Sequence, residues 1–161
     1  MTGKIRPALL DDAPAISQIL RELDYFTHIA NASPEEVADR FRRHLELCDA
    51  DDSHTVLVAE NETGVVGYAS VHWLPYLLLP GVEGYLSELF VRESERGKGI
   101  GTALLEAIKE QAHDRGCYRL MLTNGEDRPA YQRGFYQERG WTERPGIANF
   151  VLLLQENRDK S

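Results

Sequence analysis

Cysteine is scarce in this chain of 161 residues: the sequence holds Cys48 and Cys117 alone, and no C-x-x-C pair. Such a pair is typical of a structural zinc site or a redox-active dithiol, so the sequence predicts neither, and we expect no metal ion. In a reducing compartment both thiols are expected to act as small buried apolar groups. A disulfide between them and a nucleophilic role for either are the less favoured alternatives.

Long apolar runs and clusters of basic residues are missing as well. No apolar run approaches the roughly 20 residues that a helix needs to cross a bilayer, and residues 1–7 lack the apolar core and the cleavage site of a signal peptide. We therefore expect no membrane partner and a cytoplasmic location. The formal net charge of −8 would repel a nucleic acid, so we expect none as a partner, whereas it weakly favours a cationic small molecule.

The remaining composition is that of an ordinary globular protein. Hydrophobic residues make up 42% and charged residues 27% of the chain, which disfavours both a disordered and a fibrous class. A chain of 161 residues is long enough for one hydrophobic core and short for two. Because no repeat, low-complexity segment or linker interrupts it, we expect a single domain over residues 1–161.

Apolar periodicity and turn residues predict an α/β protein, more narrowly α+β, with elements in the order β-α-α-β-β-β-α-β-α-β. The expected elements are a strand over 4–9, a helix capped by Asp11 and Asp12, a helix opened by a capping box at 33–36, strands over 54–60, 65–73 and 85–91, a helix over 99–115, a strand over 118–123, a helix over 129–139 and a strand over 147–154. Pro7 confines the first strand to a sheet edge or to the strand's start. The turn at 61–64 makes an antiparallel hairpin, whereas the strands joined by the long helix should be parallel. We therefore expect a central twisted, mixed β-sheet flanked by helices.

The most informative segment is Arg96-Gly97-Lys98-Gly99-Ile100-Gly101-Thr102, which lies between an expected strand and a long amphipathic helix. The start of a helix offers unpaired backbone amides and the positive end of the helix dipole. Glycines let a phosphate approach those amides closely, and Arg96 and Lys98 add positive charge. The spacing fits neither the P-loop nor the dinucleotide-binding pattern. We therefore predict a pyrophosphate site; the alternative is a glycine turn without a ligand.

Three motifs resemble those of the GNAT family of N-acetyltransferases. The first, Arg96-x-x-Gly99-x-Gly101, is similar to the loop with which family members cradle the pyrophosphate of coenzyme A. The second, Leu89-Phe90-Val91, resembles the end of the family's fourth strand, where a bulge turns backbone amides toward the thioester carbonyl and the pantetheine arm. The third, at residues 135–141, resembles the family's F-Y-x-x-x-G-W segment. The resemblance covers roughly residues 56–154 and implies the GNAT fold.

The resemblance also implies acetyl-CoA as the acyl donor and assigns residues to its binding. These residues are Leu89, Phe90, Val91, Arg96, Gly97, Lys98, Gly99, Ile100, Gly101 and Thr102. The sequence departs from the family at Pro129, where many members carry an asparagine that contacts the pantetheine arm. Asn124, at the end of the fifth expected strand, is the candidate for that role instead.

Acyl transfer from a thioester needs an amine that has lost a proton, because a free alkylammonium has a pKa of about 10.4. Glu88 is the candidate base: the family often carries a glutamate on this strand, and an unpaired carboxylate is costly in an otherwise hydrophobic strand. Backbone amides around Phe90 and Val91 would stabilise the oxyanion. The resemblance implies Tyr136 as the acid that protonates the departing thiolate, with attack in a ternary complex. The alternatives are a salt-bridged or solvated Glu88 and a packed Tyr136.

Other side chains are weaker candidates. His28 and His72 are possible bases, although a lone histidine is more often packed or solvated. Glu83 and Tyr85 could hold a cationic group of the substrate. Trp73 could line the acceptor pocket or, equally well, pack in the core.

The sequence leaves the acceptor open. We favour a small-molecule amine, because the apolar loop over residues 74–84 would close the open groove that an extended peptide needs. The alternatives are acetylation of a protein lysine or N-terminus, and a non-catalytic module that binds acyl-CoA. Retention of Glu88 and Tyr136 disfavours the last of these. Family members often form homodimers, so a homodimer is a further expectation from the resemblance.

Overall fold

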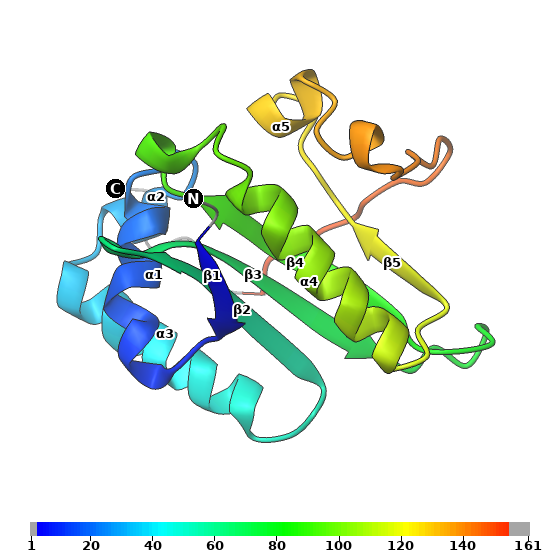
Figure 1. Cartoon of the computed structure of the whole chain (residues 1–161), viewed down its shortest axis with the longest axis horizontal. Helices are drawn as coiled ribbons and strands as arrows, with labels where there is room; N and C mark the ends of the chain where they lie inside the picture. Colours follow the sequence, from blue (N-terminus) through cyan, green and yellow to red (C-terminus); the bar gives the residue numbers. More distant parts are fainter. Residues whose placement is uncertain (1–2, 155–161) are drawn as a thin grey trace. The chain divides into compact units, whose positions relative to one another are not determined.

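The computed structural model describes residues 3–154 of the chain (Figure 1). The chain divides into two compact units, residues 1–123 and residues 124–161. The first unit contains a β-sheet and the longer helices, and the second contains short helical turns. The expectation of one domain over the whole chain stays a prediction.

The first unit is built on one five-stranded sheet in the order β1-β2-β3-β4-β5. The strands are β1 (Lys4–Pro7), β2 (His54–Asn61), β3 (Gly64–Leu74), β4 (Glu83–Val91) and β5 (Arg119–Leu122). Neighbouring strands are antiparallel except β4 and β5, which are parallel. The mixed sheet, the β2–β3 hairpin and the parallel β4–β5 pair confirm the predictions. β1 lies at the sheet edge, where Pro7 interrupts no inner ladder of hydrogen bonds.

Helices cover both faces of this sheet (Figure 1). The helical elements of this unit are η1 (Leu10–Asp12), α1 (Ala13–Arg21), α2 (Thr27–Ala30), α3 (Pro34–Asp49), η2 (Glu93–Glu95) and α4 (Ile100–Asp114). α1 and α3 pack on each other and over Tyr68 of β3. The preceding residue, Gly67, faces α4, because a β-carbon added there would lie 3.3 Å from the Ile100 side chain. Since successive strand residues point to opposite faces, α4 covers the face opposite to α1 and α3.

The position of α4 is set by its apolar stripe. The buried residues of the stripe recur at the helical spacing and are Ile100, Leu104, Leu105, Ile108 and Ala112. Each fully buried leucine or isoleucine side chain stabilises the fold by about 1.5–3 kcal/mol. Gly116, with a φ of 66°, follows the end of the helix in the left-handed conformation that commonly ends helices. The loop before α4 is therefore attached to a helix anchored along its length.

α3 begins with the capping box that the sequence predicted. The Ser33 hydroxyl accepts a hydrogen bond from the Glu36 amide at 3.2 Å, and the Glu36 carboxylate accepts one from the Ser33 amide at 3.0 Å. The short helix α2, which precedes α3, was not predicted. Its four residues are too few for an apolar period to be visible in the sequence.

The predicted capping of α1 by Asp11 and Asp12 is wrong. Asp12 occupies the N-cap position but makes no side-chain cap bond. Its carboxylate instead accepts hydrogen bonds from Arg6 Nη1 and from the Leu9 amide, each at 2.7 Å. The guanidinium of Arg6 is the main reason that the pKa of Asp12 lies below its usual range. The turn η1 thus ties the start of α1 to β1 rather than capping the helix.

The second unit contains α5 (Pro129–Gln132) and η3 (Gln137–Arg139). The prediction of one continuous helix over 129–139 is therefore wrong. Gly134 has a φ of 67°, and this left-handed conformation cannot continue a right-handed helix. Gly140, with a φ of 84°, ends η3 at the predicted position.

The predicted last strand over residues 147–154 is also wrong. None of these residues is in a strand, although the whole segment lies within the described part of the chain. A strand needs backbone hydrogen bonds to a neighbouring strand, and among the described residues the sheet ends at β5. The apolar side chains stay exposed, with Phe150 at 91% and Leu154 at 88% of their full accessible area.

Candidate active site

The loop before α4 has the backbone of an anion-binding turn. Gly97 and Gly99 have φ values of 75° and 83°, which favour glycine, and a β-carbon added at Gly97 would meet no atom within 4 Å. The Ala103 amide is bonded to the Gly99 carbonyl at 2.9 Å. The amides of Ile100 and Gly101 therefore precede this first turn of helical hydrogen bonds, and Gly99 offers no side chain to cap them.

The two cations of this loop have partners of their own. Arg96 Nε donates to the Val91 carbonyl at 3.1 Å, which ties the loop to the end of β4. Lys98 Nζ lies 3.1 Å from the Glu95 carboxylate, which also accepts from Asn61 at 3.3 Å. An exposed ion pair of this kind contributes only about 0–1 kcal/mol. Lys98 can therefore exchange Glu95 for a phosphate at little cost.

β4 carries a bulge beside this loop. Ser70 of β3 lies opposite Glu88, but the next residue, Val71, lies opposite Leu86, so Ser87 is an extra residue in β4. A bulge disrupts the ladder and leaves backbone groups unpaired, which makes it a recurrent feature beside active sites. The sequence predicted a bulge near the end of this strand, but the signal did not locate it at Ser87.

Residues 89–91 follow the bulge and return to regular pairing with β3. The Phe90 ring lies 5.9 Å from the rings of both Phe26 and Tyr68, on the face that α1 and α3 cover. Val91 points to the other face, where its side chain would lie 3.3 Å from a β-carbon added at Gly67. The backbone of this segment thus separates the two layers of side chains directly after the bulge.

Glu88 is held by a buried phenol that the sequence did not single out. The Tyr68 hydroxyl donates to Glu88 Oε1 at 3.1 Å. Burial raises the pKa of Glu88 above its usual value, while the bond from Tyr68 and the charge of His44 oppose that rise. Glu88 is therefore a hydrogen-bonded, partly buried carboxylate with a raised proton affinity. No signal in the sequence pairs Tyr68 with Glu88, because the contact depends on the register of two strands.

A histidine lies on the same face at the bulge. His72 Nε2 is 2.8 Å from Ser87 Oγ, and the His72 and His54 rings are 4.3 Å apart. Burial, with a smaller contribution from His54, lowers the pKa of His72 below its usual value. The other predicted histidine, His28, lies exposed on α2 with its ring 6.3 Å from that of Phe26.

The weaker candidates on the strands take mainly structural positions. Glu83 is fully buried and forms an ion pair with Arg119 of β5. The Tyr85 hydroxyl lies 3.4 Å from the Thr123 hydroxyl. Trp73 is buried at 5% exposure, so of the two alternatives weighed for it the structure supports packing in the core.

The second unit holds Tyr136 and Asn124. The Tyr136 ring packs edge-on against Phe135 at 5.0 Å and against Trp141 at 6.0 Å. Burial raises the pKa of Tyr136 above 10, while Arg133 opposes the rise, so the phenol keeps its proton at neutral pH. Asn124 Nδ2 is buried without a hydrogen-bond partner, and a buried donor of this kind calls for a ligand or a water.

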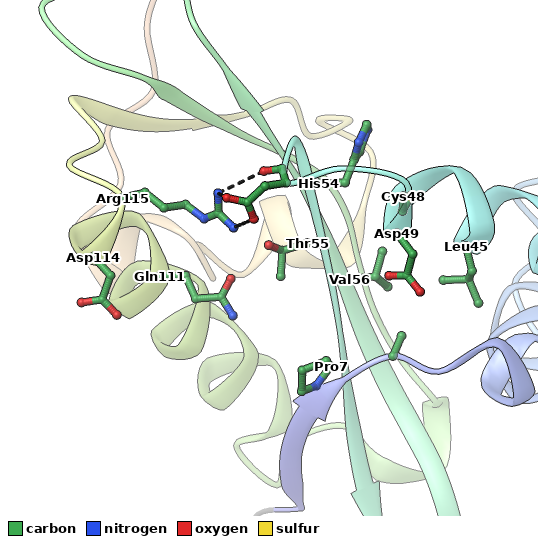
Figure 2. Close-up of a pocket in the computed structure, with 12 residues that line it drawn as sticks. Pro7, Leu45, Cys48, Asp49, His54, Thr55, Val56, Gln111, Asp114 and Arg115 are labelled. Atoms are coloured by element: carbon green, nitrogen blue, oxygen red, sulfur yellow. Dashed lines mark hydrogen bonds and ion pairs between the residues drawn. The ribbon is translucent and has the colours of Figure 1, made fainter.

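A cleft of about 490 Å³ lies elsewhere in the first unit, between the C-terminal ends of α3 and α4. Figure 2 shows Gln111 and Arg115 on one side of it and Leu45 and Asp49 on the other. Arg115 bonds the Asp52 carboxylate at 2.6 Å. None of the residues predicted for the active site lines this cleft.

Neither a cluster of metal ligands nor a membrane-spanning helix is present among the described residues. No group of three or more histidine, cysteine, aspartate and glutamate side chains within residues 3–154 could hold a metal ion. Over the same residues, no helix has the length and apolar character to cross a membrane.

Comparison with known proteins gives consistent matches. The family model described as "Acetyltransferase (GNAT) family" matches residues 17–141. The chain is 32% identical over 145 residues to the L-methionine sulfoximine/L-methionine sulfone acetyltransferase of Pseudomonas paraeruginosa. The matched region covers 88% of this chain and 81% of that protein. The chain is 30% identical over 131 residues to the thialysine N-epsilon-acetyltransferase of Bos taurus, which covers 73% and 72%. The chain shares its fold with glucosamine-6-phosphate N-acetyltransferase from Arabidopsis thaliana, with a TM-score of 0.73 at 22% identity. The superposed region covers 96% of this chain and 100% of that protein's chain.

Proposed function

Because the chain belongs to the GNAT family of acetyltransferases, we propose that it transfers the acetyl group of acetyl-CoA to a primary amine of a small molecule, by direct attack in a ternary complex. It is an acetyl-CoA-dependent N-acetyltransferase, and the finer assignments of acceptor and residues are our proposal. The observation that carries the proposal is the uncapped start of α4, where glycines in the left-handed conformation precede the amides of Ile100 and Gly101.

The residues present fit coenzyme A. The loop at 96–102 has the open backbone, the positive helix end and the exchangeable Lys98 that a pyrophosphate needs. The unpaired buried amide of Asn124 fits the carbonyl-rich pantetheine arm. We propose that these residues, with the backbone of 89–91, hold the donor. Acetyl-CoA, when bound, supplies the acetyl group as an activated thioester.

Two side chains are proposed for proton transfer. Glu88 would take a proton from the amine directly or through water, and its raised pKa makes it a stronger acceptor than an ordinary carboxylate. Tyr136 would protonate the departing thiolate, and its raised pKa keeps the phenol protonated for that step. Each such group typically accelerates a reaction by about 10²–10⁴-fold.

For the acceptor we propose a small amine with amino-acid character. The relatives named above acetylate methionine sulfoximine or methionine sulfone and thialysine, which are small molecules. The net charge of −8 supports a cationic acceptor. The alternative of a protein acceptor would be favoured by turnover of a lysine peptide in the absence of turnover on free amines.

The experiment measures acetyl-CoA turnover against a panel of amines and peptides, together with coenzyme A affinity. Gly99→Glu places a carboxylate where a phosphate should lie, and we expect a loss of about 3 kcal/mol, or about 100-fold in affinity. Gly116→Glu is the matched control, because Gly116 also has a positive φ but lies at the other end of α4. Equal losses in both variants would sink the loop assignment, and a wild type inactive on the whole panel would favour a non-catalytic binding module.

A further inference from the structure

We propose that His72 is a further proton acceptor of this active site, held by Ser87 at the β4 bulge so that its Nδ1 atom takes a proton from the attacking amine; the inference rests on the function proposed above. The sequence offered His72 only as one of two possible bases and gave no role to Ser87, since neither residue belongs to the loop or to the Phe-Tyr segment.

The hydrogen bonds of Ser87 determine which nitrogen of His72 is available. A serine hydroxyl has one proton, and Ser87 Oγ donates it to the Ser70 carbonyl at 3.3 Å. We infer that the contact of 2.8 Å between Ser87 Oγ and His72 Nε2 has the imidazole as donor. This tautomer carries its proton on Nε2 and leaves the lone pair of Nδ1 as the acceptor. The His72 residue is partly exposed.

The bulge places this imidazole at the reacting centre of the proposed mechanism. Ser87 is the extra residue of β4, and Glu88, the proposed base, is its direct neighbour. A bulge frees backbone donors from the ladder, and such donors are what a thioester carbonyl would use as its charge develops. His72, Ser87 and Glu88 thus bring two proton acceptors and the disrupted ladder to one point of the sheet.

Burial, together with the neighbouring His54, favours a neutral imidazole. The titratable groups around the pair come from three elements and are His54 of β2, Tyr85 and Glu88 of β4, and His44 and Cys48 of α3 beside Glu88. Burial and then His54 lower the pKa of His72, so the ring is in its acceptor form at neutral pH. As pH falls through that lowered pKa, the ring gains a proton and the acceptor is lost.

The proton balance of the reaction has room for a second acceptor. An alkylammonium loses two protons on becoming an amide: the C–N bond forms, the C–S bond breaks with its electron pair going to sulfur, one proton ends on that sulfur and the other goes to a base. His72 gives the second proton an acceptor that does not depend on Glu88 alone. From the imidazole the proton passes to solvent.

The test compares kcat and kcat/KM across pH for the wild type, His72→Gln and His72→Asn, using the best amine of the panel. We expect kcat at pH 7 to fall about 100-fold, with the KM for acetyl-CoA unchanged and the activity limb below pH 6.5 lost. His113→Gln, at an exposed histidine of α4, is the matched control and should keep both. A wild-type pH profile and kcat in His72→Gln would overturn the inference.

Two positioning variants keep the test decisive if His72 variants fail to fold. Ser87→Ala should lower kcat about 10-fold without changing the KM for acetyl-CoA, and Ser87→Thr, which keeps the hydroxyl, should restore most of it. His54→Gln should move the acid limb to higher pH, because His54 lowers the pKa of His72. An unmoved limb in His54→Gln together with full activity of Ser87→Ala would overturn the inference. Both results presuppose wild-type turnover, whose absence would instead refute the proposed function.

Discussion

Two helices of the first unit begin in opposite ways. α3 starts at Ser33, whose hydroxyl and whose partner Glu36 satisfy backbone amides reciprocally. α4 starts at Gly99, which has a left-handed φ of 83° and no side-chain cap. α3 is therefore complete without any other molecule, whereas α4 leaves its first amides to whatever binds there. The comparison sets a helix start whose amides are satisfied by its own side chains against one whose first amides no side chain caps.

The largest expected effect is the increase in the free energy of unfolding that coenzyme A causes, which should depend on the start of α4 and not on that of α3. At a concentration of about 100 times its Kd, coenzyme A should stabilise the wild type by about 2.7 kcal/mol. Ser33→Ala should gain the same increment from a lower starting stability, because α3 takes no part in binding. Gly99→Glu, whose affinity should be about 100-fold weaker, should gain only about 0.4 kcal/mol at that concentration. Urea unfolding with and without coenzyme A measures all three, and a smaller increment in Ser33→Ala would break the comparison.

A third helix start, that of α1, should depend on pH. Asp12 is held by Arg6 and the Leu9 amide, and its side chain is only 11% exposed. Asp12→Asn should cost about 2 kcal/mol at pH 7, because a hydrogen bond to a charged group is lost and Arg6 is left without its main partner.

The sign of this pH dependence follows from the pKa of Asp12. Because the folded pKa is depressed, the contribution is present above the unfolded value of about 3.9 and disappears as pH falls through the folded value. The difference between wild type and Asp12→Asn should therefore shrink below about pH 4. Asp11→Asn, at an exposed neighbour, is the control, and an equal cost there would contradict the role of the pair.

The next effect is the loss of the α3 cap itself. Ser33→Ala should lower the free energy of unfolding by about 1 kcal/mol, because one orphan amide loses its acceptor. Ser33→Thr keeps the hydroxyl and should stay within about 0.5 kcal/mol of the wild type. Chemical denaturation checks both. If the alanine variant were as stable as the threonine variant, the capping box would contribute nothing to α3.

These helix starts also show what the sequence could reveal. The capping box at 33–36 and the glycines before α4 are local signals, so both could be predicted without a partner in space. The bonding of Asp12 could not, because its partner Arg6 lies on β1 and competes with the helix amides for the carboxylate. The break of the predicted helix at Gly134 could not be predicted either, because an isolated glycine inside a helical segment does not by itself specify a left-handed residue.

The proposed active site also has features that the sequence could reveal and features that it could not. The loop at 96–102 and the candidates Glu88 and Tyr136 could be named from motifs. The contacts of Glu88 with Tyr68 and of His72 with Ser87 could not, since both depend on the register of β3 against β4. A single extra residue in a strand shifts that register, and the resemblance placed the bulge at the end of β4 rather than at Ser87.

The smallest expected effect separates the charge of the α4 start from its backbone. Lys98→Ala should change the free energy of unfolding by less than about 0.5 kcal/mol, since its pair with Glu95 is exposed. It should weaken coenzyme A binding about 2- to 5-fold at low salt and less at high salt, because a screened phosphate contact is lost. Lys109→Ala is the matched control, because Lys109 forms the same type of pair with Glu106 within α4, away from the loop. Equal, salt-independent changes in both variants would mean that the amides of the α4 start bind the phosphate without help from the lysine.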